Sequence, residues 1–265
     1  MGQQQSVDLL IKNAKQLVTS VGASAKPLIK EELSQVLVIE EGAVAIKDGL
    51  IAAVGTTDQV MEQITVNCHS EVIDASNQVV LPGLVDPHTH LIFAGSREHE
   101  MELKLAGKSY LEILAQGGGI LSTVRATRQA SLEELTAIGE KYAQQMLAQG
   151  TTTAEVKSGY GLDTATEIKQ LQAVQALTKM VPLELVPTFL GAHAIPPEYK
   201  QNPEQFVDLV IDEMLPQVAQ EGLAKFCDVF CEEGVFTVDQ SRRILEAAKR
   251  YGLQPKLHAD EIKPL

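Results

Sequence analysis

The sequence predicts an α/β fold of the (β/α)8 barrel type, of which only about five strand–helix units are present, preceded by a small β domain. Between residues 81 and 265, buried strand patterns alternate with amphipathic helix patterns, as in a parallel sheet covered by helices. Polar side chains gather after the carboxyl end of each predicted strand, where a barrel carries its active site. Residues 1–80 contain only short apolar strands and turns, which predicts the separate β domain.

The β domain is predicted from apolar runs that begin near residue 9 and end near residue 54. Asp48-Gly49 separates two of these runs, and this dipeptide is a strong signal for a β-hairpin turn. The individual runs cover residues 9–11, 36–39, 43–46 and 50–54.

The helices of the second region are predicted from their caps. Ser131 with Glu134, and Thr237 with Gln240, have the spacing of capping boxes, and Asp163 is placed to begin a third helix. A further helix is expected over residues 203–220, with a kink near Pro216. The strands between these helices are expected to end at His90, Val156, Phe189, Cys231 and His258.

A glycine-rich stretch tests the alternative of a doubly wound sheet that binds a nucleotide. Gly117-Gly118-Gly119 lacks the lysine and hydroxyl residue of a phosphate-binding loop and does not follow a strand. A flexible loop is the favoured interpretation, and close approach of this backbone to a ligand stays open. The barrel therefore remains the predicted fold.

Composition excludes several classes of partner. The formal net charge of −13 would repel nucleic acid. No apolar run reaches the roughly 18 residues that span a bilayer, and the amino terminus has no charged-then-apolar signal sequence, so we expect no membrane association and a cytoplasmic location. The odd number of cysteines, Cys68, Cys227 and Cys231, indicates buried free thiols rather than a disulfide framework.

The segment Pro82-Gly83-Leu84-Val85-Asp86-Pro87-His88-Thr89-His90 predicts half of a metal site. Side chains two residues apart in a strand lie on the same face, so His88 and His90 are expected to point the same way. Two parallel imidazoles at the end of a barrel strand could hold a divalent cation. The polar residues expected on the same rim are Lys157, Ser158, Tyr160, His193, Glu232, Glu233, His258, Asp260 and Glu261.

The first-strand segment resembles the signature of the amidohydrolase superfamily. Five further motifs, in this order, resemble the imidazolonepropionase family within it: Ser96-Arg97-Glu98-His99-Glu100, Gln116-Gly117-Gly118-Gly119-Ile120, Lys157-Ser158-Gly159-Tyr160-Gly161-Leu162, Gly191-Ala192-His193-Ala194 and His258-Ala259-Asp260-Glu261. The resemblance covers essentially the whole chain. It implies metal-dependent hydrolysis of 4-imidazolone-5-propanoate to N-formimino-L-glutamate in histidine degradation.

The resemblance also implies roles for individual residues. His88, His90 and His258 match the histidine ligands of one metal ion, zinc or iron, between which three imidazoles do not discriminate. Arg97 matches the arginine that holds the carboxylate of the small-molecule substrate, and Tyr160 and His193 match residues that contact it. Glu261 matches the glutamate near the reacting ring and is the candidate to position or deprotonate the attacking water.

The chemistry requires similar parts independently of the resemblance. A cyclic amide carbonyl is a poor electrophile, so a cation or a strong donor must polarise it, and a neutral His193 could donate to its oxygen. Lys157 suggests another arrangement, a carboxylated lysine between two metals. That lysine follows the fourth strand in the relatives that have it, whereas Lys157 follows the second, and we therefore favour one metal.

The sequence departs from the family after the fifth strand, because the family's barrel continues through eight. A histidine expected after the sixth strand and a metal-binding aspartate expected after the eighth have no counterpart in these 265 residues. We therefore expect this chain alone to be nearly inactive. The alternatives are another ring hydrolase or deaminase of the superfamily, and a non-catalytic fragment. For a full-length form the resemblance suggests a homodimer.

Overall fold

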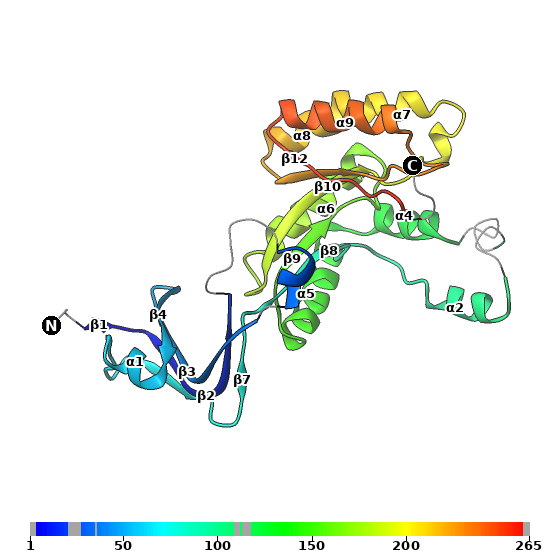
Figure 1. Ribbon diagram of the computed structural model, residues 1–265. Helices are drawn as coiled ribbons and strands as arrows, with labels where there is room; N and C mark the ends of the chain where they lie inside the picture. The colour runs from blue at the N-terminus through cyan, green and yellow to red at the C-terminus, as the bar shows by residue number, and fades with distance from the viewer. Residues whose placement is uncertain (1–3, 21–27, 35, 109–111, 113–117, 262–265) are drawn as a thin grey trace. The chain divides into compact units, whose positions relative to one another are not determined.

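The computed structural model describes residues 4–20, 28–34, 36–108, 112 and 118–261. Contacts divide the chain into two compact units, Met1–Gly83 and Leu84–Leu265, both drawn in Figure 1. Among the described residues, no helix is long and apolar enough to cross a lipid bilayer.

The first unit is built around β2 (Leu9–Thr19), which pairs antiparallel with β3 (Leu37–Lys47) and parallel with two short strands. β3 pairs in turn with β4 (Leu50–Thr56) through the expected hairpin. Asp48 and Gly49 both have positive φ, 52° and 75°, as a tight hairpin turn requires. The other elements are β1 (Gln5–Ser6), η1 (Lys30–Ser34), α1 (Thr57–Met61), β5 (Ile64–Thr65), β6 (Glu71–Asp74) and β7 (Val79–Val80).

The cysteines correct one expectation from the sequence. Cys68, in the first unit, is exposed, whereas Cys227 and Cys231 in the second unit are buried free thiols as predicted. Cys68 lies in a turn after β5, where no neighbouring strand covers it.

The second unit contains a parallel sheet in the order β12-β11-β10-β9-β8. Its strands are β8 (Leu84–Thr89), β9 (Thr151–Lys157), β10 (Glu184–Ala192), β11 (Phe226–Val229) and β12 (Gln254–Pro255). The five predicted strands are confirmed, but β10 continues to Ala192, and β11 and β12 end at Val229 and Pro255 rather than at Cys231 and His258, where the pairing continues only as an isolated bridge between Phe230 and His258. Because neighbours in the sequence are neighbours in the sheet, their carboxyl ends form one continuous rim, as in the first part of a (β/α)8 barrel.

The helices of the second unit begin where their caps predict. The capping boxes of Ser131 with Glu134 and of Thr237 with Gln240 are both formed, and the side chain of Asp163 accepts a hydrogen bond from Thr166 N–H. The elements are α2 (Glu98–Leu105), α4 (Ile120–Gln129), α5 (Leu132–Ala148), α6 (Thr164–Leu177), η2 (Pro197–Tyr199), α7 (Pro203–Leu209), η3 (Val210–Met214), α8 (Leu215–Gln220) and α9 (Val238–Arg250).

The expected kink near Pro216 takes the form of a π-helical turn. α7 continues through the π-helical segment η3 into α8, and Pro216 lies in the first turn of α8. Proline has no N–H to donate and its ring crowds the carbonyl four residues earlier, so the preceding turn widens.

Two α-helices described in the second unit, α2 and α4, were not predicted, and α4 explains part of the glycine-rich stretch. Gln116 and Gly117 lie outside the described residues, but Gly119 precedes α4 with φ of 70°. Its N–H donates to the buried carboxylate of Glu100 on α2, at 2.6 Å. Gly119 therefore ends a turn and starts a helix.

The core of the second unit lies between the sheet and its helices. Figure 1 shows α9 running alongside β11 and β12, and α6 beside β10. Fully buried side chains such as Phe189, Phe206 and Phe236 fill this layer. With one face of the sheet packed in this way, the rim at the strand ends is left to carry polar side chains.

Candidate metal centre

The rim brings four of the six histidines together. The ring of His88 lies 4.5 Å from that of His258, and the ring of His90 stacks on that of His193 at 4.8 Å and 10°. Tyr160 lies 5.1 Å from His90 by ring centroids. Residues from β8, β9, β10 and the segment after β12 thus meet at one place.

Three of these histidines form a group able to hold a metal ion. One ring nitrogen from each of His88, His90 and His258 lies within 4.8 Å of the other two.

The protonation of His90 suits a ligand. Burial, together with the neighbouring His193 and His258, lowers the pKa of His90 to about 2, so the ring is neutral at pH 7 and keeps a lone pair. Its Nδ1 atom is buried without a hydrogen-bond partner in the described structure. A buried polar atom without a partner is costly, and a cation would satisfy an imidazole nitrogen that carries no proton. The residues present therefore fit a divalent metal ion.

Beneath the histidines lies a buried ionic network. Asp228 Oδ2 accepts hydrogen bonds from Lys157 Nζ at 2.7 Å and from His258 Nδ1 at 2.8 Å. Burial acts to raise the pKa of Asp228, but the hydrogen bonds from His258 and Lys157 outweigh it and lower the value to about 2. Glu155 adds a second carboxylate 2.9 Å from Lys157 Nζ. Asp228 is thus a buried carboxylate anion that accepts from two side chains and from the backbone N–H of Val229.

This network bears on the alternative of a carboxylated Lys157. Lys157 is 2% exposed, and its Nζ lies 2.9 Å from Glu155 and 2.7 Å from Asp228, so two carboxylates engage the atom that carboxylation would modify. The lysine is committed to ion pairs, and the arrangement favours a single metal.

His193 is held by a hydrogen bond that fixes its tautomer. Its Nδ1 lies 2.9 Å from the carbonyl oxygen of Gly159, and because a carbonyl only accepts, Nδ1 carries the proton. Burial lowers the pKa of His193 to about 4, so the ring is neutral at pH 7 and Nε2 has a lone pair. In this tautomer the free nitrogen of the neutral ring is an acceptor, and the contact of His193 with the substrate stays a prediction.

The loop after β9 presents Tyr160 and the Gly159 carbonyl to the rim. Glu167 of α6, fully buried, accepts hydrogen bonds from the N–H groups of Gly159, Gly161 and Leu162 at 2.8–3.0 Å. Gln170 accepts from Tyr160 N–H at 3.2 Å. From the other side, Arg128 donates to the carbonyls of Gly161 and Leu162. Hydrogen bonds with side chains of α4 and α6 thus hold the backbone of this loop in place.

Arg97 and Tyr160 line a common pocket of about 260 Å³. Burial raises the pKa of the Tyr160 hydroxyl, which the nearby Arg97 charge opposes, so the phenol stays protonated and can donate. The pocket wall is completed by aromatic rings, with Phe93 stacked on Tyr142 at 5.9 Å. An arginine and a phenol in one small pocket can bind a carboxylate.

Glu261 is exposed near the end of the described chain. Its N–H donates to Oε2 of Glu232 at 3.1 Å, and Glu232 is only 2% exposed. The buried carboxylate at the end of β11 therefore anchors the turn that carries Glu261.

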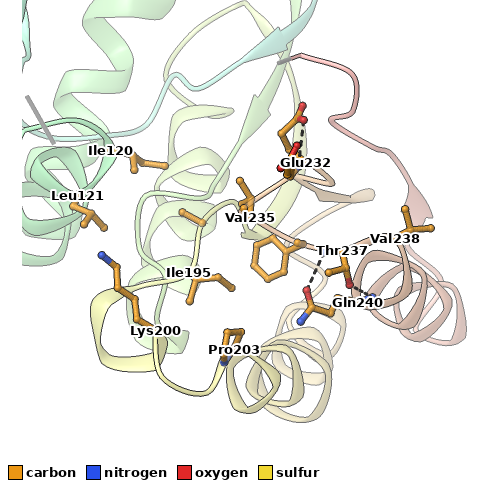
Figure 2. A pocket seen from close by; sticks show the side chains of 14 residues that line it. Ile120, Leu121, Ile195, Lys200, Pro203, Glu232, Val235, Thr237, Val238 and Gln240 are labelled. Atoms are coloured by element: carbon orange, nitrogen blue, oxygen red, sulfur yellow. Dashed lines mark hydrogen bonds between the residues drawn. The ribbon is translucent and has the colours of Figure 1, made fainter. Parts of the chain in front are cut away.

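A second pocket, of about 900 Å³, opens next to this rim (Figure 2). Figure 2 shows mostly apolar side chains, among them Ile120, Ile195 and Val235, with Lys200 at one side. Two of the predicted rim residues, Glu232 and Glu233, also line it. None of the predicted ligands or substrate-contacting residues lines this pocket.

Sequence reasoning missed the residues that hold the site in place: Arg128, Glu155, Glu167, Gln170 and Asp228. A signal existed for three of them. Glu167 and Gln170 each lie four residues before an apolar side chain, Leu171 and Val174, on the buried stripe of α6, where polar side chains need a specific partner. Asp228 interrupts a buried apolar strand, so its side chain also needs a specific partner.

Comparison with known proteins places the second unit in a family. A model described as "Amidohydrolase family" matches residues 79–264. The imidazolonepropionase of Alkaliphilus metalliredigens is 56% identical over 259 residues, which are 98% of this chain and 61% of that protein. The imidazolonepropionase of Geobacillus kaustophilus is 53% identical over 257 residues, 97% of this chain and 61% of that protein. The chain thus spans about three fifths of the length of these relatives.

Solved structures share the fold. A zinc-bound adenosine deaminase from Xanthomonas campestris superposes with a TM-score of 0.61 at 19% identity, covering 98% of this chain and 51% of that one. Guanine deaminase from E. coli gives a TM-score of 0.60 at 16% identity, covering 94% of this chain and 52% of that one. At this level of identity the likeness concerns the fold alone.

Proposed function

The chain belongs to the amidohydrolase family, and from this premise we propose that it supplies three metal ligands and the substrate clamp of an enzyme that hydrolyses 4-imidazolone-5-propanoate to N-formimino-L-glutamate. The similarity to imidazolonepropionases over nearly the whole chain supports the substrate. The observation that carries the proposal is the pocket of Arg97 and Tyr160, because Tyr160 also lies beside His90. A ring bound at the histidines could place its propionate on Arg97.

One zinc or iron ion would be held by His88, His90 and His258. When bound, such an ion supplies Lewis acidity and lowers the pKa of a water molecule. The neutral state of His90 and the position of Asp228 behind His258 prepare the imidazoles for this role.

The chain's own residues bind and orient the substrate. Arg97 would grip the propionate through its planar fork of N–H donors, and the Tyr160 hydroxyl would add a donor from the same pocket. Nε2 of His193 would accept a ring N–H, since Nδ1–H is committed to Gly159. These three contacts define one face of the ring.

Glu261 would handle the protons. Hydrolysis joins the water oxygen to the carbonyl carbon and breaks the bond from that carbon to the ring nitrogen. One water proton goes to the leaving nitrogen, and the other is released as the new acid ionises. The Glu261 carboxylate, on the turn that Glu232 anchors, could take the first proton from the water and deliver it to the leaving ring nitrogen.

The test uses the chain alone and the chain joined to the carboxyl-terminal part of the Alkaliphilus metalliredigens relative. Metal-loaded protein is incubated with 4-imidazolone-5-propanoate, and N-formimino-L-glutamate is followed by NMR. We expect product from the joined protein and little from the chain alone. No ring opening by the metal-loaded joined protein would refute the proposed function, and equal activity of both would refute the expectation that the chain is incomplete as a catalyst.

The role of Arg97 is tested in the same joined protein. Arg97→Met should lower kcat/KM by about 10- to 100-fold, the cost of losing a charged hydrogen-bonded pair, with metal content unchanged. Arg242→Met on exposed α9 is the matched control and should have no effect. An unchanged kcat/KM in Arg97→Met would remove Arg97 from the substrate site.

The working enzyme is further proposed to be a cytoplasmic homodimer without a nucleic-acid or membrane partner. The net charge of −13 supports the absence of nucleic-acid binding. Sedimentation of the joined protein should give twice the mass of one chain, and a monomer would contradict the proposed dimer.

A further inference from the structure

The hydrogen bond between Asp228 and His258 decides how one proposed ligand is presented. Nδ1 of His258 lies 2.8 Å from Oδ2 of Asp228, and the two side chains are 6% and 2% exposed. An ionised carboxylate only accepts, so Nδ1 carries the proton of this hydrogen bond, and Nε2 is the ring nitrogen left for a metal ion. A histidine without this partner would distribute its proton between both nitrogens.

Asp228 itself cannot rotate away. Its Oδ2 also accepts from Lys157 Nζ at 2.7 Å, and its Oδ1 accepts from the N–H of Val229 at 2.8 Å. Both oxygens are therefore engaged, one by the backbone of β11 and one by two side chains from β9 and the segment after β12. The carboxylate plane is fixed by the sheet.

Lys157 is fixed in the same way. Glu155 lies 2.9 Å from Lys157 Nζ, and Glu155 also accepts from Thr188 and from Lys256. Positive and negative groups alternate along this path through the interior of the sheet. The contact with Lys157 stabilises the ionised form of Asp228. The carboxylate therefore accepts the hydrogen bond of His258 without taking its proton.

We propose that Asp228 is a positioning residue for the metal centre: it selects the Nδ1–H tautomer of His258 and directs Nε2 toward His88 and His90. This inference rests on the proposed metal site but not on the proposed substrate. Carboxylate partners of ligating histidines typically raise metal affinity about 10- to 100-fold. The competing interpretation is that Asp228 only balances the charge of Lys157 and has no effect on His258.

The tautomer is read directly by 15N NMR of the histidine rings in the metal-free chain. Wild-type protein should show His258 with its proton on Nδ1. Asp228→Leu removes the acceptor while filling the space, and should give His258 as the Nε2–H form or a mixture. Asp228→Asn keeps an acceptor oxygen and should retain the Nδ1–H form. Lys157 stays paired with Glu155 in both variants.

The matched control is Lys256→Met. It removes another ion pair of the same network, 2.6 Å from Glu155, but has no contact with Asp228 or His258 among those found in the described residues. It should leave the His258 tautomer unchanged. A shift of the tautomer in this variant as large as that in Asp228→Leu would mean that the network, and not Asp228, sets the ring.

Metal affinity gives the second readout. Titration of the chain with Co²⁺, followed by its visible absorption, should show binding about 10- to 100-fold weaker in Asp228→Leu than in wild type, and near-wild-type binding in Asp228→Asn and Lys256→Met.

Two results would overturn the proposal. One is a wild-type His258 with its proton on Nε2, which needs no variant and so decides the question even if Asp228→Leu does not fold. The other is an unchanged tautomer and Co²⁺ affinity in Asp228→Leu. If the tautomer shifts as expected but the joined protein does not open imidazolone, the positioning role stands and the proposed substrate fails.

Discussion

A Cβ added to Gly159 would lie 2.8 Å from Nδ1 of His193, closer than a Cβ atom approaches other heavy atoms in proteins. Gly159 also has φ of 108°, a conformation that residues with a side chain rarely adopt. The backbone carbonyl of Gly159 accepts the hydrogen bond of His193 Nδ1–H, so this glycine both makes room for the ring and sets its tautomer. The orientation of the His193 ring therefore depends on the backbone conformation of Gly159.

Gly159→Ala should therefore displace His193. We expect a free energy of unfolding lower by about 2–4 kcal/mol from strain and the clash together, and loss of ring opening in the joined protein with metal content retained. Gly222→Ala is the control, because Gly222 has φ of 63° but nothing within 4 Å of the added Cβ. It should cost about 1 kcal/mol, and an equal loss in the two variants would mean that strain alone acts at Gly159.

Glu167→Ala should destabilise the second unit. Three backbone N–H groups lose their acceptor in a buried place, and unsatisfied buried groups cost about 1–3 kcal/mol each before water or rearrangement relieves them. We expect a loss of about 3 kcal/mol in urea unfolding. Glu221→Ala, at an exposed position that also accepts side-chain hydrogen bonds, should stay within about 0.5 kcal/mol. Equal effects would show that the loop does not depend on Glu167.

Stability should fall with acid because of His193. Its pKa is lowered from 6.5 to about 4 in the folded chain, so between these values the unfolded state binds more protons than the folded one. The contribution of His193 to the free energy of unfolding is therefore fully present above pH 6.5. It is lost as the pH falls toward 4, which lowers that free energy by about 2 kcal/mol for a partly exposed ring. His90, with a pKa of about 2, adds a loss in the same direction.

Urea unfolding of the metal-free chain at pH 7.5 and pH 4.5 measures this effect. His193→Asn cannot titrate and should show a smaller difference between the two pH values. The same difference in both proteins would contradict the lowered pKa of His193.

Metal should stabilise the chain and a chelator should reverse the effect. Zinc at 100 times its dissociation constant contributes about 2.7 kcal/mol if it binds only the folded state. His88→Ala removes one exposed ligand and should abolish most of this gain. His69→Ala, at an exposed position in the first unit, should keep it. Full zinc stabilisation in His88→Ala would exclude His88 as a ligand.

The sequence by itself determined the local parts of this protein: the order of five strands, the capping boxes at Ser131 and Thr237, the hairpin at Asp48-Gly49, and the histidine pair at the end of β8. These follow from periodicity, caps and turn chemistry, which act over a few residues. The tertiary structure alone decided the tautomers of His193 and His258, the ion pairs of Lys157 and the acceptor role of Glu167. The contacts of Lys157 and of the two histidines depend on partners as far as 71 residues away, which the register of parallel strands brings within hydrogen-bonding distance, and those of Glu167 depend on a loop five to eight residues earlier that folds back onto α6.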